Sequence, residues 1–143
     1  MSRHGYSLSI VSLAAIASLT LSCSSSPRRM LQSIVVSPAS ADAQSFPNGQ
    51  VAYTATGTYN TSPHTVTPLT ANWGIANLDG SPTAAITVDA NGVAQCSAGA
   101  SGGYSVGAWG LMDPTTRTTC ASSDPYGEPG CNAVLGTAQL TCP

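Results

Sequence analysis

Apolar and polar residues alternate along several short segments of this chain. From Val51 to Tyr59 the odd positions read Val-Tyr-Ala-Gly-Tyr and the even positions read Ala-Thr-Thr-Thr. A period of two residues predicts a β-strand with one buried face. Further strands are predicted in the segments 33–37, 69–75, 85–88, 104–108 and 137–142. Turn residues are frequent and no amphipathic helical pattern follows the N-terminus, so about seven short strands predict an all-β fold, an antiparallel β-sandwich.

The sequence Asp-Ala-Asn-Gly at 89–92 lies between two apolar segments and predicts a β-hairpin. Asn and Gly tolerate the positive φ angles that tight hairpin turns require. A four-residue loop places Val88 opposite Val93, and a two-residue loop places Val88 opposite Gln95. We predict the longer loop, because it keeps the apolar residues on one face of the hairpin.

The N-terminus has the pattern of an export signal. Residues 7–21 are uncharged and rich in Leu, Ile, Val and Ala, and they are shorter than a membrane-spanning helix of about 20 residues. The run ends in Leu-Thr-Leu-Ser-Cys at Cys23, which resembles the lipobox of bacterial lipoproteins. This resemblance implies a signal peptide at 1–22, a lipidated Cys23 and membrane anchoring, with a flexible linker over 23–30. The alternative is an ordinary secretory signal with a chance cysteine.

Charged residues make up only 7% of the chain, and the formal net charge is −2. Lysine is absent, and Arg117 is the one arginine beyond residue 30. A nucleic-acid-binding surface needs clustered basic residues to neutralise phosphates. The sequence therefore excludes nucleic acid as a partner.

Five cysteines occur in the chain, and four remain when Cys23 is set aside. An even number in an exported chain predicts two disulfides, with three possible pairings. The spacing favours Cys120–Cys131, which closes a short loop, and Cys96–Cys142, which ties two strands together. A four-cysteine zinc site is the alternative, but the chain lacks the close C-x-x-C pair of most zinc sites.

Six segments, taken in order, resemble the bacterial immunoglobulin-like (Big, group 2) family. They are Ser33–Pro38, Tyr53–Tyr59, Ala71–Trp73, Ala85–Ala94, Gly103–Trp109 and Gly136–Thr141. The resemblance implies an immunoglobulin-like β-sandwich over 31–143, of the kind found in adhesins and other bacterial surface proteins. Such domains act as spacers or adhesive units, and the resemblance brings no catalytic residue and no cofactor.

A long insertion from about residue 110 to 132 departs from the family pattern, as does Cys142 in place of a closing aliphatic residue. Loops at the ends of such sandwiches recognise partners, so Trp109, Arg117 and Tyr126 are the candidate binding residues. Trp109 either lies exposed beside the insertion or is covered by it. Trp73 is expected to pack in the core, as tryptophans on the third strand of such sandwiches do.

Metal and catalytic chemistry receive little support from the residues. Asp113, Asp124 and Glu128 offer carboxylates for Ca²⁺, but they lack the spacing of a calcium loop. His64 is the one histidine beyond the signal peptide, and no G-x-S-x-G motif accompanies it. We therefore predict no metal site and no enzyme activity.

Three functional hypotheses remain at this point. The favoured one is a lipoprotein of the outer membrane or cell surface whose 110–132 loop binds an extracellular protein or glycan. The second is a purely structural envelope subunit or spacer that assembles through a strand edge. The third and weakest is a small metal-dependent hydrolase.

Overall fold

The computed structural model describes residues 26–115 and 132–143. Within these ranges the chain forms ten strands and two short 3₁₀ segments, η1 (Ala43–Ser45) and η2 (Pro47–Gly49), and no α-helix. The strands are β1 (Leu31–Ser37), β2 (Ser40–Asp42), β3 (Gln50–Ala52), β4 (Thr54–Tyr59), β5 (Thr65–Val66), β6 (Asn72–Asn77), β7 (Ile86–Val88), β8 (Val93–Cys96), β9 (Gly102–Leu111) and β10 (Ala133–Cys142). The predicted mostly-β fold is confirmed. No helix in the described ranges is long and apolar enough to cross a membrane.

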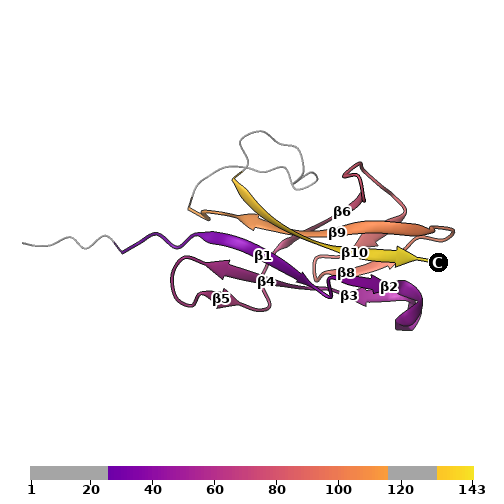
Figure 1. The fold of residues 1–143 in the computed structure, drawn as a ribbon, viewed down its shortest axis with the longest axis horizontal. Coiled ribbons are helices and arrows are strands. Elements are labelled where there is room, and N and C mark those ends of the chain that lie inside the picture. Colours follow the sequence, from indigo (N-terminus) through magenta and orange to yellow (C-terminus); the bar gives the residue numbers. More distant parts are fainter. Residues whose placement is uncertain (1–25, 116–131) are drawn as a thin grey trace, which may run out of the picture.

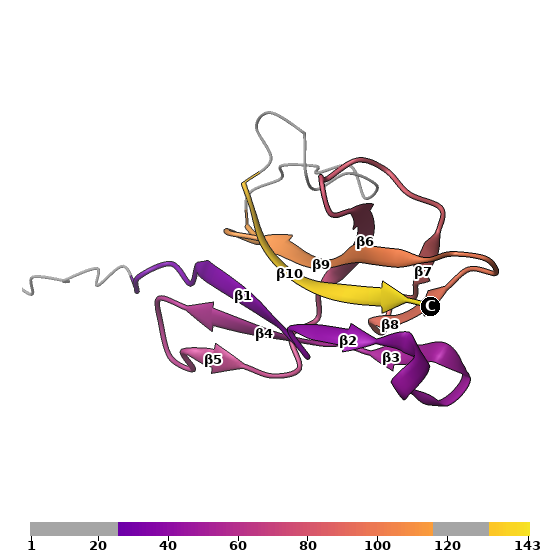
Figure 2. The ribbon, with the colours of Figure 1, turned by 45° about the vertical axis from the view of Figure 1, so that its right-hand side comes forward.

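Three hydrogen-bonded sheets make up the fold. Their strand orders are β1-β4-β5, β3-β8-β7 and β2-β10-β9-β6. All pairs are antiparallel except β2 with β10, which run parallel. Figure 2 shows β6, β9 and β10 lying over a lower layer that contains β1, β3 and β4. The two layers are therefore each built from segments distant in sequence.

The predicted strand at 51–59 is one run of chain with a single interruption. It is divided into β3 and β4 at Tyr53, whose backbone N–H donates to the Gly92 carbonyl at 2.9 Å instead of joining either sheet. The predicted inward residues Val51, Tyr53 and Ala55 are all buried. The period-two pattern therefore identified the buried face correctly, whereas the break comes from a contact with the hairpin.

The hairpin between β7 and β8 has a register that neither predicted loop gives. Val88 pairs with Ala94, and the Asp89 N–H donates to the Val93 carbonyl at 3.0 Å. The loop has three residues, Ala90 to Gly92, and Gly92 has φ +81°. A type I turn followed by a left-handed glycine favours this length. The prediction that Val88 lies opposite Val93 is wrong, and Val88 shares its face of the hairpin with Ile86, Ala94 and Cys96 instead.

The core lies between the two layers. Its buried apolar residues come from β1, β3, β4, β7, β8, β9 and β10 and include Ile34, Val51, Ile86, Val106 and Leu140. Tyr53 crosses this core, and its hydroxyl donates to the Gln139 carbonyl of β10 at 2.8 Å. Burial raises the pKa of Tyr53 to about 12, so the hydroxyl remains a hydrogen-bond donor at neutral pH.

A glycine in β10 allows β1 to approach closely. A β-carbon added at Gly136 would lie 2.8 Å from the carbonyl carbon of Ile34 and would overlap its carbonyl oxygen. Because that neighbour is backbone, a larger side chain at Gly136 would force the two strands apart. The close approach holds β1 against the four-stranded sheet as well as against β4.

Candidate functional site

The structure describes only some of the residues that the sequence predicts to form sites. Cys23, Arg117, Cys120, Tyr126 and Cys131 all lie outside the described residues. The signal peptide lies outside them too, as does most of the predicted insertion at 110–132. The described parts that bear on function are Trp109, the two ends of the insertion, the segment before β1 and the predicted Cys96–Cys142 pair.

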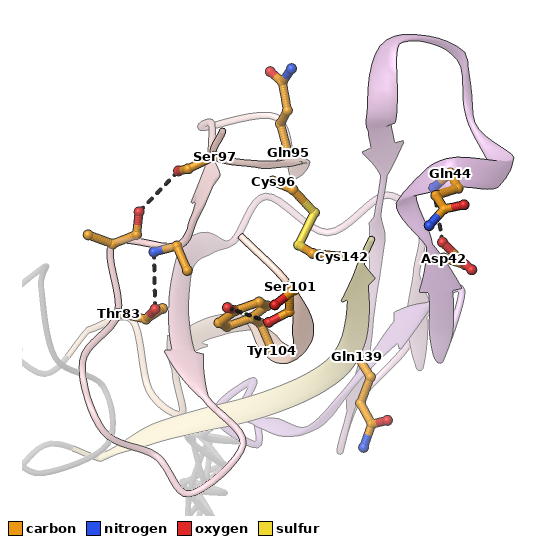
Figure 3. Close-up of a disulfide and its surroundings, with 12 residues drawn as sticks. Asp42, Gln44, Thr83, Gln95, Cys96, Ser97, Ser101, Tyr104, Gln139 and Cys142 are labelled. Atoms are coloured by element: carbon orange, nitrogen blue, oxygen red, sulfur yellow. Dashed lines mark hydrogen bonds between the residues drawn. A yellow bond between two sulfur atoms is a disulfide. The ribbon is translucent and has the colours of Figure 1, made fainter. Parts of the chain in front are cut away.

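The predicted disulfide between Cys96 and Cys142 is confirmed. The two Cα atoms are 5.9 Å apart, and the bond joins β8 to β10. Figure 3 shows the sulfur bridge connecting these strands, with Gln95 pointing away from it. Since β8 and β10 belong to different sheets, the bond links the two layers of the fold. It lies at the end of the molecule where the chain finishes.

Trp109 is buried, with only 4% of its surface exposed. The exposed alternative considered for this residue is therefore wrong. Its backbone lies inside the four-stranded sheet, opposite Leu135 on β10 and Asn72 on β6. The indole Nε1–H is buried and has no hydrogen-bond partner among the described residues. A buried donor without an acceptor is unfavourable, so Trp109 contributes through packing rather than polar contact.

The first end of the insertion is held by Asp113. Its carboxylate accepts hydrogen bonds from the Thr115 hydroxyl at 2.7 Å, the Thr115 backbone N–H at 2.9 Å and the Arg28 guanidinium at 2.9 Å. These donors, Thr115 first, lower the pKa of Asp113 below its usual 3.8. The ionised carboxylate therefore stabilises the fold at neutral pH, and this stability is lost as the pH falls through the lowered pKa.

The segment before β1 is fastened to the domain, although the sequence places it in the linker. Asn60, just after β4, accepts from the Met30 N–H at 2.7 Å and donates through its side chain to the Arg28 carbonyl at 3.0 Å. The Arg29 guanidinium lies 4.0 Å from the ring centroid of Tyr59 and donates to the Ser62 carbonyl at 3.0 Å. We call residues 28–30 the N-terminal arm.

Trp73 packs against the core, as predicted, but it is only partly buried. Gly92 lies directly on its indole, because a β-carbon there would be 2.6 Å from Trp73 Cζ2. Beside this contact a groove of about 310 Å³ is lined by Trp73, Thr54, Thr70 and Asn91, among others. We call it the flank groove.

A second groove, of about 320 Å³, lies beside the disulfide at the C-terminal end. We call it the end groove. Its lining includes Phe46, which is 37% exposed, together with the amide side chains of Gln44, Asn48 and Gln95. The lining carries no charged side chain. An aromatic ring among neutral amides is suited to an uncharged polar ligand.

Metal-binding and catalytic groups do not converge in the described part of the chain. There, no three side chains of His, Cys, Asp or Glu lie close enough together to hold a metal ion. His64 is exposed, and its Nδ1 lies 3.1 Å from the carbonyl oxygen of Tyr59. Of the three carboxylates considered for calcium, Asp113 holds the contacts given above, and Asp124 and Glu128 lie outside the described residues.

Sequence reasoning missed the N-terminal arm. Two adjacent arginines, Arg28 and Arg29, precede the first strand of a chain that has only four basic residues. This pair of basic residues was the available signal, but the partners of Arg28, Asp113 and Asn60, lie far along the chain.

Neither a scan against protein-family models nor a search of curated proteins found a match to this chain.

Proposed function

We propose that this protein is a lipid-anchored protein of the bacterial envelope whose immunoglobulin-like sandwich is a non-catalytic binding module. Membership of the Big group 2 family is part of this proposal. The observation that most strongly supports this assignment is the order of the strands in the two layers. Immunoglobulin domains place strands A-B-E-D in one sheet and C-F-G in the other.

Counting β3 and β4 as one interrupted strand, the order β1, β3/β4, β8, β7 corresponds to A-B-E-D. The order β6, β9, β10 corresponds to C-F-G. Trp73 then occupies strand C, where immunoglobulin domains carry a buried tryptophan. The correspondence supports the finer assignment, with one departure: the disulfide joins strands E and G instead of B and F.

Export and anchoring are supported by the cysteines. A disulfide between sheets persists in an oxidising compartment, which agrees with a secretory signal. The lipobox resemblance at Cys23 supplies the anchor. Binding is favoured over catalysis because the grooves gather neutral amides, hydroxyls and an aromatic ring. Such linings suit a neutral glycan.

The anchor and the disulfides are tested by the intact mass of the protein from its native membrane fraction. We expect a mass that begins at Cys23 and includes added acyl chains. Reduction should add about 2 Da for each disulfide, so about 4 Da if Cys120 and Cys131 are also paired. A chain that begins at Cys23 without acyl mass, or begins elsewhere, contradicts the anchor.

The binding role is tested on an array of neutral oligosaccharides with the Phe46→Ser variant. Loss of an aromatic anchor in a binding site costs about 2 kcal/mol, so affinity should fall roughly thirtyfold. The matched control is Val35→Ser, since Val35 is 57% exposed on β1 and lies outside both grooves. Equal affinity of the two variants, or no binding by the wild-type chain, favours the structural-subunit hypothesis.

A further inference from the structure

The N-terminal arm leaves little free chain between Cys23 and the folded domain. Only residues 24–27 separate the cysteine from Arg28, whose contacts with Asp113 and Asn60 are described above. A fully extended chain covers at most about 3.6 Å per residue, so the Cα atoms of Cys23 and Arg28 are no more than about 18 Å apart. An anchor at Cys23 therefore holds this part of the domain close to its attachment point.

The arm contacts both layers of the fold, so it cannot pivot freely. On one side Asn60, which follows β4, holds the backbone of Met30 and Arg28. On the other side the Arg28 guanidinium donates to the carboxylate of Asp113, just after β9, at 2.9 Å. The residue that follows the arm, Leu31, donates its backbone N–H to the Met112 carbonyl at 2.8 Å. Release of the arm would break contacts with both layers at once. The direction in which the chain enters the domain is therefore set by the fold.

The arm lies at one end of the molecule, and the end groove lies at the other. In Figure 1 the chain enters on the left beside β1 and β5, while the C-terminus and η1–η2 lie on the right. β10 has ten residues and runs from the entry end toward the C-terminal end. At about 3.3 Å per residue this strand alone spans about 30 Å.

The entry end carries the positive charge of the described residues. Arg28 keeps 65% of its side chain exposed, Arg29 is partly exposed, and the nearby Met112 is an exposed apolar side chain. The carboxylate there, Asp113, is buried and ion-paired with Arg28. The other described carboxylates are Asp42, Asp79 and Asp89, on β2 and in the turns that follow β6 and β7.

We propose that the entry end rests on the headgroups of an anionic phospholipid bilayer, with Arg28 and Arg29 facing lipid phosphates and the end groove pointing away. The inference rests on the proposed anchor at Cys23. The net charge of −2 does not oppose it, because charges beyond about 10 Å are largely screened at 0.1 M salt. An acyl anchor combined with nearby basic residues is a known means of binding such surfaces, and each basic residue near the surface adds to the affinity.

The test uses the isotope-labelled chain from Cys23 onward, with Cys23 coupled chemically to a maleimide phospholipid in phosphatidylglycerol nanodiscs. A gadolinium-bearing lipid broadens amide signals near the bilayer. We expect severalfold greater signal loss at Leu31, Asn60 and Met112 than at Gly49 and Ala98. Equal loss at both ends, or greater loss at the C-terminal end, overturns the proposal.

Two variants test the contacts of the arm and its charge. Asn60→Ala removes the two side-chain hydrogen bonds of Asn60 with the arm but keeps both arginines, and it should reduce the difference between the two ends. Arg28→Gln combined with Arg29→Gln should weaken the difference, whereas Gln44→Ala at the opposite end should leave it unchanged. The same spectra report whether each variant is folded. An unchanged difference in Asn60→Ala overturns the role of the arm.

The chemical coupling also separates this inference from the proposed function. If native protein carries no acyl chain but the coupled chain shows the expected difference, the anchor proposal fails and the orientation stands. If the native chain is acylated and the coupled chain shows no difference, the orientation alone fails.

Discussion

Replacing Cys96 and Cys142 together by alanine should lower the free energy of unfolding by about 4 kcal/mol. The two residues are 46 positions apart, and a crosslink across a loop of that length removes about that much conformational freedom from the unfolded chain. Small domains are stable by only about 5–15 kcal/mol, so the loss is a large part of the total. Because the bond also joins the two layers of the fold, the layers should separate more easily without it.

Guanidinium denaturation followed by circular dichroism measures this change. The control is Cys120→Ala combined with Cys131→Ala, which removes the cysteines that would close the shorter loop and should cost less. A loss below about 1 kcal/mol in the Cys96 and Cys142 variant would show that the bond contributes little to stability.

Trp109→Ala should destabilise the fold by about 3–5 kcal/mol, the usual cost of removing a large buried aromatic side chain. The residue is only 4% exposed, so its removal leaves a cavity next to the four-stranded sheet. Trp109→Phe should cost much less. It keeps most of the packing and removes the indole N–H, which is buried and has no partner in the described part of the chain.

Thermal and guanidinium unfolding of the two variants test this prediction, and the control is Phe46→Ala, because Phe46 is 37% exposed. Surface substitutions rarely change stability by more than about 0.5 kcal/mol. A change that small in Trp109→Ala would mean that the side chain lies at the surface in solution. Trp109→Phe as destabilising as Trp109→Ala would instead point to an unrecognised acceptor for the indole N–H.

Local patterns in the sequence identified most of the strands, although not the short strands β2 and β5. The alternation at 51–59 identified Val51, Tyr53 and Ala55 as inward-facing, because the side-chain period of a strand is two whatever it packs against. Pro38 correctly marked the end of β1 at Ser37. The even number of cysteines and their spacing also led to the Cys96–Cys142 bond. Each of these features depends on residue type, on neighbouring positions or on the number and spacing of cysteines.

Contacts between distant segments decided the rest. The packing of the hairpin is one example, because a β-carbon at Gly92 would lie 2.6 Å from Trp73 and 2.7 Å from the Tyr53 carbonyl oxygen. The alternation of residues assigns Trp109 to one face of β9. That face is covered as well, so the alternation alone did not reveal that Trp109 is buried. The prediction of a flexible linker over 23–30 did not anticipate the N-terminal arm, because Arg28 and Asp113 are 85 residues apart. Sequence alone thus determined the location of most strands and the Cys96–Cys142 pairing. Only the tertiary structure decided which surfaces are covered and at which end of the domain the N-terminal arm is held, because both depend on contacts between distant segments that no local pattern encodes.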